Sequence, residues 1–415
     1  MSNKKTSEVV IIGAGPSGLA AANMLGNAGI ETIVLEKSTK AGSKNFHSTV
    51  IKQSLYENIF NSKESNKTQK SDLLYERTVN QQRIYLLKKD SYLVLNHHEE
   101  NEKKIAVLKE TLNYWMANIV ENSGITIYEN TVAKELITQS GKICSVRTDT
   151  NDEYYANVIL IAEGVNSQLV KSSGLTSYNY STDQFFLFVE ENILLPSEVI
   201  EERLNLQKGQ GMSGIFFTTS FFELPSIAYL HTNKDSISLS IGIKFSSSIS
   251  KETNINQFQE ILKTHPAIKP IIAGGITNHY NSYMLPVITN DITNTHTPKL
   301  YGDSFLLIGG AAHLVNPFSW DFSSLPIESA KIASETIIKA KNLNDFSKKS
   351  LSYYEKLLNE SVEFKKLKLN SSKGSKFSLS FMKNESSISD LLNTNDGDLL
   401  DNKTLVNLGA IISKG

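Results

Sequence analysis

The sequence contains very little cysteine and very little arginine. Among its 415 residues there is one cysteine, Cys144, which excludes an intramolecular disulfide and an iron–sulfur cluster held by this chain alone. Only four of the 42 basic residues are arginines (Arg77, Arg83, Arg147 and Arg203), and all the others are lysines. A lysine at a position where a related protein has arginine therefore fits this composition and does not by itself indicate a changed function.

Long hydrophobic runs and an excess of one charge are also missing. No run of about 18 apolar residues is present and the N-terminus is mostly polar, so the sequence predicts neither a transmembrane helix nor a signal peptide. The cytoplasm is the expected location. The formal net charge is −1, which gives no indication of a nucleic-acid partner. With 40 % apolar and 20 % charged residues, the composition is typical of a globular protein.

A glycine-rich turn near the N-terminus joins a short apolar run to a helix-forming stretch. The run is residues 9–12, and the turn is Gly13-Ala14-Gly15-Pro16-Ser17-Gly18. In a dinucleotide-binding turn, Gly13 makes the tight bend, Gly15 lets the backbone approach a pyrophosphate, and Gly18 lets the helix pack against the sheet. The pyrophosphate then meets the free N–H groups at the positive end of the helix.

An acidic residue stands where the second strand of this unit ends. Residues 32–35 are predicted to form a buried strand, and Glu36 at its tip is placed to accept hydrogen bonds from adenosine ribose hydroxyls. An acid at this position disfavours a 2′-phosphate, and hence NADP. Glu36-Lys37 followed by residues 41–45 resembles the FAD-binding start of flavoprotein oxidoreductases more than an NAD dehydrogenase. The alternative is a glycine-rich turn in an α/β protein that binds no dinucleotide.

The rest of the chain predicts an α/β protein in which a Rossmann-like FAD-binding domain is interrupted by an antiparallel domain. Residues 185–245 are rich in strand patterns, and residues 301–312 return to the first domain before a long helix over 326–341. One amphipathic helix is expected over 351–367. The predicted divisions are 1–180 and 299–345 for the FAD-binding domain, 181–298 for an antiparallel substrate domain, and 346–415 for a helical segment with a polar tail.

These motifs together resemble the FixC and electron-transfer-flavoprotein:quinone oxidoreductase group, which is related to the geranylgeranyl reductases. The residues that carry the resemblance extend over about 8–370, and they are Gly13–Gly18 with Glu36, Gly42-Ser43-Lys44-Asn45, Val107-Leu108-Lys109, Asn113-Tyr114-Trp115, residues 161–167, His265-Pro266-Ala267-Ile268 and Leu300-Tyr301-Gly302-Asp303. The resemblance implies a glutathione-reductase-type fold, FAD as the cofactor, and electron transfer through the flavin.

The resemblance also implies a set of cofactor-binding positions. These are Gly13, Gly15, Pro16, Ser17, Gly18, Glu36, Lys37, Lys44, Asn45, Lys109, Val132, Glu163, Gly164, Gly310 and Ala311. Lys109 stands where the group is expected to have an arginine, and it keeps the charge without the planar guanidinium. Glu163-Gly164 stands where the group usually has Asp-Gly. No side chain stands out as an acid, base or nucleophile, so no catalytic residue is predicted, and no metal site is expected.

The part of the sequence expected to surround the flavin ring departs from the group's pattern. Relatives have an aspartate for the ribityl hydroxyls where this chain has Gly310, so Gly310→Asp is expected to strengthen flavin retention in a flavoenzyme. Residues 316–324 lack the glycines that relatives have, and Phe46-His47 replace a glycine pair. Trp320 and Phe322 either stack near a flavin or fill its volume, and we favour a packing role for both.

The expected function is that of a FAD-dependent oxidoreductase of the electron-transfer type. Its redox partner is a small molecule or a protein, such as a separate ferredoxin or an electron-transfer flavoprotein, because this chain lacks the four-cysteine segment of larger relatives. One alternative is a flavin-impaired scaffold or binding protein that keeps the AMP-binding fold. Another is a flavin monooxygenase or reductase acting on a lipid-like or secondary-metabolite substrate. The absence of a spanning helix still permits peripheral membrane contact.

Overall fold

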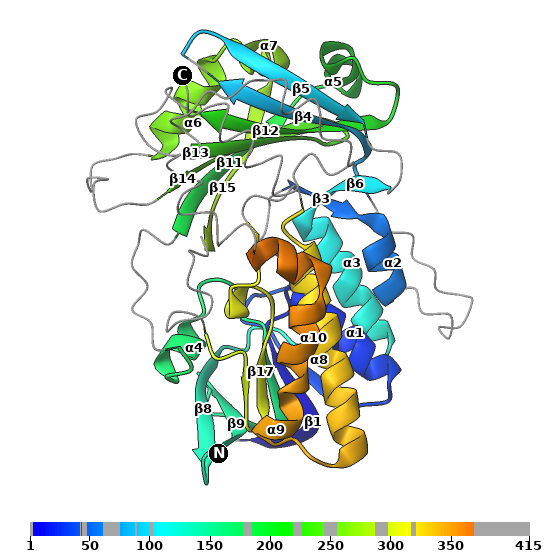
Figure 1. Cartoon of the computed structure of the whole chain (residues 1–415), viewed down its shortest axis with the longest axis vertical. Coiled ribbons are helices and arrows are strands. Elements are labelled where there is room, and N and C mark those ends of the chain that lie inside the picture. Colours follow the sequence, from blue (N-terminus) through cyan, green and yellow to red (C-terminus); the bar gives the residue numbers. More distant parts are fainter. Residues whose placement is uncertain are drawn as a thin grey trace.

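Two β-sheets, each with its own helices, form the molecule (Figure 1). The fold is taken from a computed structural model, which describes residues 3–41, 43, 48–60, 75–87, 89–98, 103–176, 185–218, 226–244, 255–286, 298–316 and 321–368. The architecture is mixed α/β, as predicted. Within these ranges, no helix is both long and apolar enough to cross a membrane.

The first sheet has eight strands and a parallel centre. Its main path runs β16-β17-β10-β1-β2-β7, and the hairpin of β8 and β9 attaches to β10. The strands are β1 (Lys4–Ile12), β2 (Thr32–Leu35), β7 (Thr126–Tyr128), β8 (Ala133–Gln139), β9 (Lys142–Thr148), β10 (Glu153–Ile161), β16 (Tyr301–Gly302) and β17 (Phe305–Leu307). Because β1, β10 and β17 are parallel, their carboxyl ends meet at one edge of the sheet.

Helices pack against this sheet through buried apolar side chains. Helix α1 (Pro16–Asn27) contacts both α3 (Lys109–Asn122) and α8 (Ser324–Leu343), and these helices lie side by side in Figure 1. The shorter helices of this part are α2 (Gln53–Phe60), α4 (Gln168–Ser172), α9 (Lys348–Leu351) and α10 (Tyr353–Glu360). The predicted single helix over 351–367 is interrupted at Ser352 and Ser361, so it is a series of short helices.

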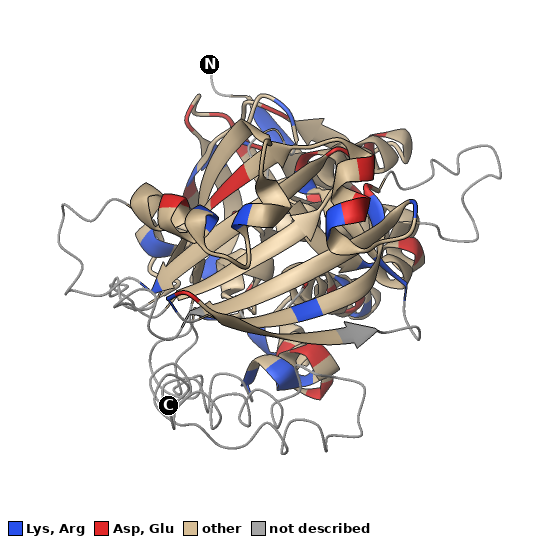
Figure 2. Cartoon of the chain, turned by 90° about the horizontal axis from the view of Figure 1, so that it is seen from above, with Lys and Arg blue, Asp and Glu red and all other residues tan. Residues whose placement is uncertain are grey.

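The second sheet has nine strands and is antiparallel except where β4 meets β12. Its order is β15-β11-β14-β13-β12-β4-β6-β3, with β5 paired to β4. The strands are β3 (Ser48–Lys52), β4 (Arg77–Leu87), β5 (Tyr92–His98), β6 (Lys104–Leu108), β11 (Phe185–Leu194), β12 (Gln210–Thr218), β13 (Ser226–Thr232), β14 (Ser236–Lys244) and β15 (Ile276–Pro286). Figure 2 shows few charged residues on these strands and both signs of charge on the helices.

The two faces of the second sheet pack against different layers. One face is covered by α5 (Ser197–Leu204), α6 (Ile255–Thr264) and α7 (Lys269–Ile272). The other, inner face carries Phe188 and Tyr229, which pack with Val315 and Phe322 from the segment that follows β17. The inner face of the second sheet therefore lies against the first part of the molecule.

The strands between residues 48 and 108 belong to the second sheet. The prediction assigned residues 1–180 to the FAD-binding domain, but β3 to β6 pair within the second sheet. The chain thus enters the second sheet twice, first through β3–β6 and again through β11–β15. The domain boundaries stay predictions.

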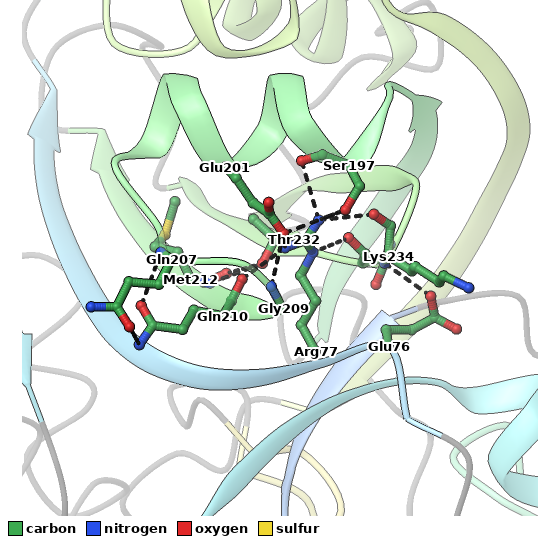
Figure 3. A network of polar contacts seen from close by, with 11 residues as sticks. Glu76, Arg77, Ser197, Glu201, Gln207, Gly209, Gln210, Met212, Thr232 and Lys234 are labelled. Atoms are coloured by element: carbon green, nitrogen blue, oxygen red, sulfur yellow. Dashed lines mark hydrogen bonds and ion pairs between the residues drawn. The ribbon is translucent and has the colours of Figure 1, made fainter.

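A buried arginine fixes the far end of the second sheet (Figure 3). Arg77, the first residue of β4, is 1 % exposed. Its guanidinium donates to the carbonyl oxygens of Asn233, Lys234 and Gln210, to Ser197 Oγ at 2.6 Å and to Glu201 Oε1 at 2.8 Å. These bonds tie β4 to the start of β12, to α5 and to the turn between β13 and β14. All five N–H donors of the guanidinium have acceptors, so its role is structural.

Candidate functional site

Three turns meet at the carboxyl edge of the first sheet. The backbone N–H of Gly13 donates to Leu35 O at 2.8 Å, and that of Ala162 donates to Ile12 O at 2.8 Å. The N–H of Ile308 donates to Ile161 O at 3.0 Å in the same way. These bonds hold the glycine-rich turn, the Glu163-Gly164 turn and the Gly309-Gly310 turn beside one another, and we call these three turns the composite binding edge.

The glycines of the first turn differ in what surrounds them. Gly13 has φ +107°, and a Cβ atom there would lie 2.5 Å from Ala162 O. A Cβ atom at Gly18 would lie 1.9 Å from Gly13 O, so only glycine fits at these two positions. A Cβ atom at Gly15 would have no other atom within 4 Å. Gly15 therefore borders open space, which leaves room for a diphosphate to approach the backbone.

The N-terminus of α1 faces the same space. Gly15 is the N-cap residue, and no side chain caps the helix. Pro16 has no N–H, and the first intrahelical bond is donated by Leu19 N to Gly15 O at 2.9 Å. The N–H groups of Ser17 and Gly18 precede that bond. Together with the helix dipole, they suit a bound anion.

Glu36 lies at the end of β2 and is 8 % exposed. Its Oε2 accepts a hydrogen bond from the N–H of Ala14 at 2.7 Å, and its Oε1 accepts one from the N–H of Ser38 at 2.8 Å. The carboxylate is thus held directly beside the glycine-rich turn. The N–H of Thr131 donates to Glu36 O, which brings Val132 next to this end of the site, where Val132 is 38 % exposed. Lys37 is exposed.

Glu163 lies in the turn after β10 and accepts hydrogen bonds from the backbone of α4. Its two carboxylate oxygens accept hydrogen bonds from the N–H groups of Leu169 and Val170, at 3.1 and 2.8 Å. Burial raises the pKa of this carboxyl, although the two hydrogen bonds act to lower it. Glu163 therefore supports the start of α4. Gly164, with φ +84°, faces open space and keeps the turn close to the site.

The Gly309-Gly310 turn is packed tightly against both other turns. A Cβ atom at Gly309 would lie 2.3 Å from Ser17 Oγ, and one at Gly310 would lie 2.8 Å from the backbone nitrogen of Val165. Ala311 is fully buried. A side chain at Gly310 thus requires the neighbouring turn to move. This contact gives a structural reason for glycine at a position where relatives are expected to have aspartate.

Several predicted positions lie outside the residues that the structure describes. They are Gly42, Lys44, Asn45, Phe46, His47 and Trp320. Phe322 is described, and it is 8 % exposed with its ring 5.1 Å from that of Tyr229 in an edge-on arrangement. A packing role for Phe322, which the sequence favoured, is confirmed by this contact.

Lys109 begins α3, and the charge of Glu190, a buried acid that sequence reasoning missed, acts on its amine. The residue as a whole is half-buried, but protein surrounds its amine densely, and this burial lowers the pKa of Lys109 to about 8, partly opposed by the charge of Glu190. Glu190, on β11, is 4 % exposed, and burial raises its pKa to about 8. The alternation of β11 was the available signal, because Phe186 and Phe188 point inward and Glu190 continues their phase.

Comparisons with known proteins address this site directly. Residues 6–200 match the family model described as FAD binding domain. The chain is 28 % identical over 369 residues to Protein FixC of Azorhizobium caulinodans, covering 87 % of this chain and 82 % of the relative. It is 29 % identical over 361 residues to "Probable electron transfer flavoprotein-quinone oxidoreductase YdiS" of Escherichia coli, covering 85 % and 81 %. The resemblance to the FixC group is confirmed.

Solved structures agree with this result at the level of the fold. A geranylgeranyl bacteriochlorophyll reductase-like protein from Thermoplasma acidophilum superimposes with a TM-score of 0.74 at 17 % identity, over 100 % of this chain and 93 % of the other. The flavin-dependent brominase Bmp2 gives 0.71 at 13 % identity, over 98 % and 94 %. The FixC-like chain therefore has the fold of FAD-dependent oxidoreductases, and FAD is its cofactor.

Proposed function

We propose that this FixC-like chain is a FAD-dependent oxidoreductase that passes electrons from a donor to a quinone-type or protein acceptor through its flavin. The observation that carries the proposal is the edge where Gly13, Gly15 and Glu36 meet two further turns, together with relatives named FixC and electron transfer flavoprotein-quinone oxidoreductase over most of the chain. A glutathione-reductase-type arrangement of the FAD domain is part of this proposal.

The described residues fit the AMP half of FAD. The open space at Gly15 and the uncapped N-terminus of α1 suit the diphosphate, Glu36 suits the ribose hydroxyls, and Val132 lies where the adenine would pack. When bound, FAD supplies the redox chemistry by accepting and releasing electrons. The protein's own residues bind and orient the cofactor. The inner face of the second sheet would cover it.

The partner is proposed from the relatives' names. An electron-transfer flavoprotein or a ferredoxin is the expected protein partner, since this chain has one cysteine and cannot hold an iron–sulfur cluster alone. A cytoplasmic location, with peripheral contact to a membrane when a quinone is the acceptor, completes the proposal.

The first test is the visible absorption spectrum of the purified protein with and without added FAD. Bound flavin should give bands near roughly 370 and 450 nm, the usual values for the oxidised cofactor. The holoprotein is then mixed anaerobically with a reduced electron-transfer flavoprotein, and reduction of a soluble ubiquinone analogue is followed. A protein that stays colourless in excess FAD contradicts the proposal and favours the scaffold alternative.

A further inference from the structure

The middle turn of the composite binding edge touches both of the other turns. A Cβ atom at Gly13 would lie 3.4 Å from Glu163 Cα. On the other side, a Cβ atom at Gly310 would lie 2.8 Å from the backbone nitrogen of Val165. The turn of residues 163–165 is therefore packed between the Gly13 turn and the Gly310 turn. Any shift of this middle turn changes the spacing between the other two.

The side chain of Glu163 ties this middle turn to α4. Its two carboxylate oxygens accept hydrogen bonds from the N–H groups of Leu169 and Val170, at 3.1 and 2.8 Å. Both of these apolar residues are buried in the core of the first sheet, so α4 is a fixed anchor. Residues 163–170 thus form a ring that is closed by one carboxylate.

The N-cap residue of α4 does not take over this role. Ser167 has φ +24°, in the left-handed region, and its Oγ donates to Gly164 O at 2.6 Å and does not cap the helix. The N–H groups of the first turn of α4 therefore depend on Glu163 as their acceptor. Without the carboxylate, the N–H groups of Leu169 and Val170 would lose their partners, and the ring would open.

The length of the glutamate side chain matters for the same reason. The FixC group usually has Asp-Gly where this chain has Glu163-Gly164, and an aspartate carboxylate would end roughly 1.5 Å nearer the backbone. It would reach the two N–H groups of α4 only if the middle turn moved towards the helix. Such a movement would take Val165 away from its place beside Gly310.

We propose that Glu163 is a positioning residue for the cofactor, whose carboxylate anchors residues 163–165 to α4 and so sets the spacing between the Gly13 turn and the Gly310 turn. The inference rests on the proposed function, because it takes FAD as the ligand of the composite binding edge. It makes FAD affinity depend on a carboxylate that acts through the backbone of the middle turn, with no contact to FAD required.

The first experiment is a titration of the apoproteins with FAD, followed by quenching of flavin fluorescence. Glu163→Gln keeps the size of the side chain but loses one of the two acceptors, so it should bind FAD about tenfold or more weakly than wild type. Glu163→Asp keeps the charge but not the reach, and it should bind about threefold or more weakly. If the aspartate variant binds as wild type does, the charge matters and not the geometry, and the inference fails. It also fails if both variants bind FAD within about twofold of wild type and differ only in the thermal stability of the apoprotein.

A double-mutant cycle with Gly310→Ala tests the link between the turns. In wild-type protein the added Cβ atom meets the Val165 turn, which Glu163 holds in place. In the Glu163→Gln background that turn can yield, so the further loss of FAD affinity caused by Gly310→Ala should be smaller by about threefold or more. Equal factors in the two backgrounds would mean that the two sites act independently, which overturns the inference.

The matched control is Asp345→Asn. The carboxylate of Asp345 accepts the N–H of Ser347, the N-cap residue of α9, at 2.9 Å. This cap lies at the opposite edge of the first sheet, because the N–H of Ser304, just before β17, donates to Phe346 O. The variant should bind FAD as wild type does, and an equal loss in Asp345→Asn and Glu163→Gln overturns the inference. A Glu163→Gln variant that matches wild type overturns it as well and leaves the proposed function intact. Wild-type protein that binds no FAD overturns both.

Discussion

Individual glycines at the composite binding edge differ in whether a side chain would meet protein or open space. Gly18 abuts the backbone of Gly13, whereas Gly15 borders a space without protein atoms. The same residue type therefore serves packing at one position and ligand access at another. This difference can be measured, because a single added methyl group should affect stability at one position and cofactor binding at the other.

We expect Gly18→Ala to lower the free energy of unfolding by about 1–3 kcal/mol or more, because its Cβ atom would lie 1.9 Å from Gly13 O. Gly15→Ala should change the free energy of unfolding by less than about 1 kcal/mol. It should weaken FAD binding by about tenfold or more, equivalent to about 1.4 kcal/mol. Urea denaturation of the apoprotein and FAD titration separate the two effects. Equal losses of stability in both variants would argue against open space at Gly15.

The contact at Gly310 changes what should follow from restoring an aspartate there. A Cβ atom would lie 2.8 Å from the backbone nitrogen of Val165, so Gly310→Asp and Gly310→Ala should both lower the free energy of unfolding by about 1–3 kcal/mol. We therefore expect less stable apoprotein in both cases. Thermal melts of the apoproteins test this, and FAD titration shows whether the aspartate adds affinity over alanine. An aspartate variant as stable as wild type would mean that the Val165 turn moves freely.

The sequence was sufficient to predict these glycines, but not Glu190. Each glycine in the first turn follows a local rule about backbone angle or close approach, and such rules act within a few residues. The burial of Glu190 depends on pairing with β14 and β15 and on contact with Ser48, which is 142 positions away in the chain. No local pattern contains that information. The available sequence signal was the alternation of β11, in which Glu190 has the same spacing of two as the inward-facing Phe186 and Phe188.

At the scale of elements, strand patterns were recognised more reliably than their partners. β4 and β5 pair in the second sheet, and β4 lies parallel to β12, a strand far along the chain. Alternation in a strand identifies its faces but not the strand beside it, so sheet membership was not available from the sequence. The antiparallel character of residues 185–245 was predicted because consecutive hairpins pair locally.

Arg77 connects β4 to α5, to the start of β12 and to the turn between β13 and β14. Arg77→Ala should lower the free energy of unfolding by about 3–5 kcal/mol, because Glu201 and several buried carbonyl oxygens would lose their donor. Arg77→Lys keeps the charge but not the planar set of donors, and it should cost less. Urea denaturation measures both. Arg147→Ala is the control: the side chain of Arg147 is 36 % exposed, water screens its ion pairs, and its loss should cost far less than that of Arg77. Similar losses at both positions would contradict a special role for Arg77.

At the scale of the whole molecule, the two sheets are linked at several places and should unfold together. The chain crosses between them from β2 to β3 and again through α3, which connects β6 to β7. The N–H of Ser48 bonds to Glu190, and Val315 and Phe322 pack into the aromatic cluster of the second sheet. A ligand that binds only the folded state then stabilises both sheets, although it contacts chiefly the first. At a free concentration 100 times its dissociation constant, FAD should add about 2.7 kcal/mol to the free energy of unfolding.

We test this coupling in a Trp320→Phe variant, in which Trp115 of α3 is the remaining tryptophan. Fluorescence then reports on the FAD-binding part, and far-ultraviolet circular dichroism reports on both sheets. The two urea transitions should coincide, and FAD should shift them together, since a cooperative unit has one free energy of unfolding. If FAD shifts the fluorescence transition alone and leaves a second dichroism transition behind, the sheets unfold separately. The hydrogen bond from Ser48 to Glu190 and the packing of Val315 and Phe322 would then be too weak to couple the two sheets.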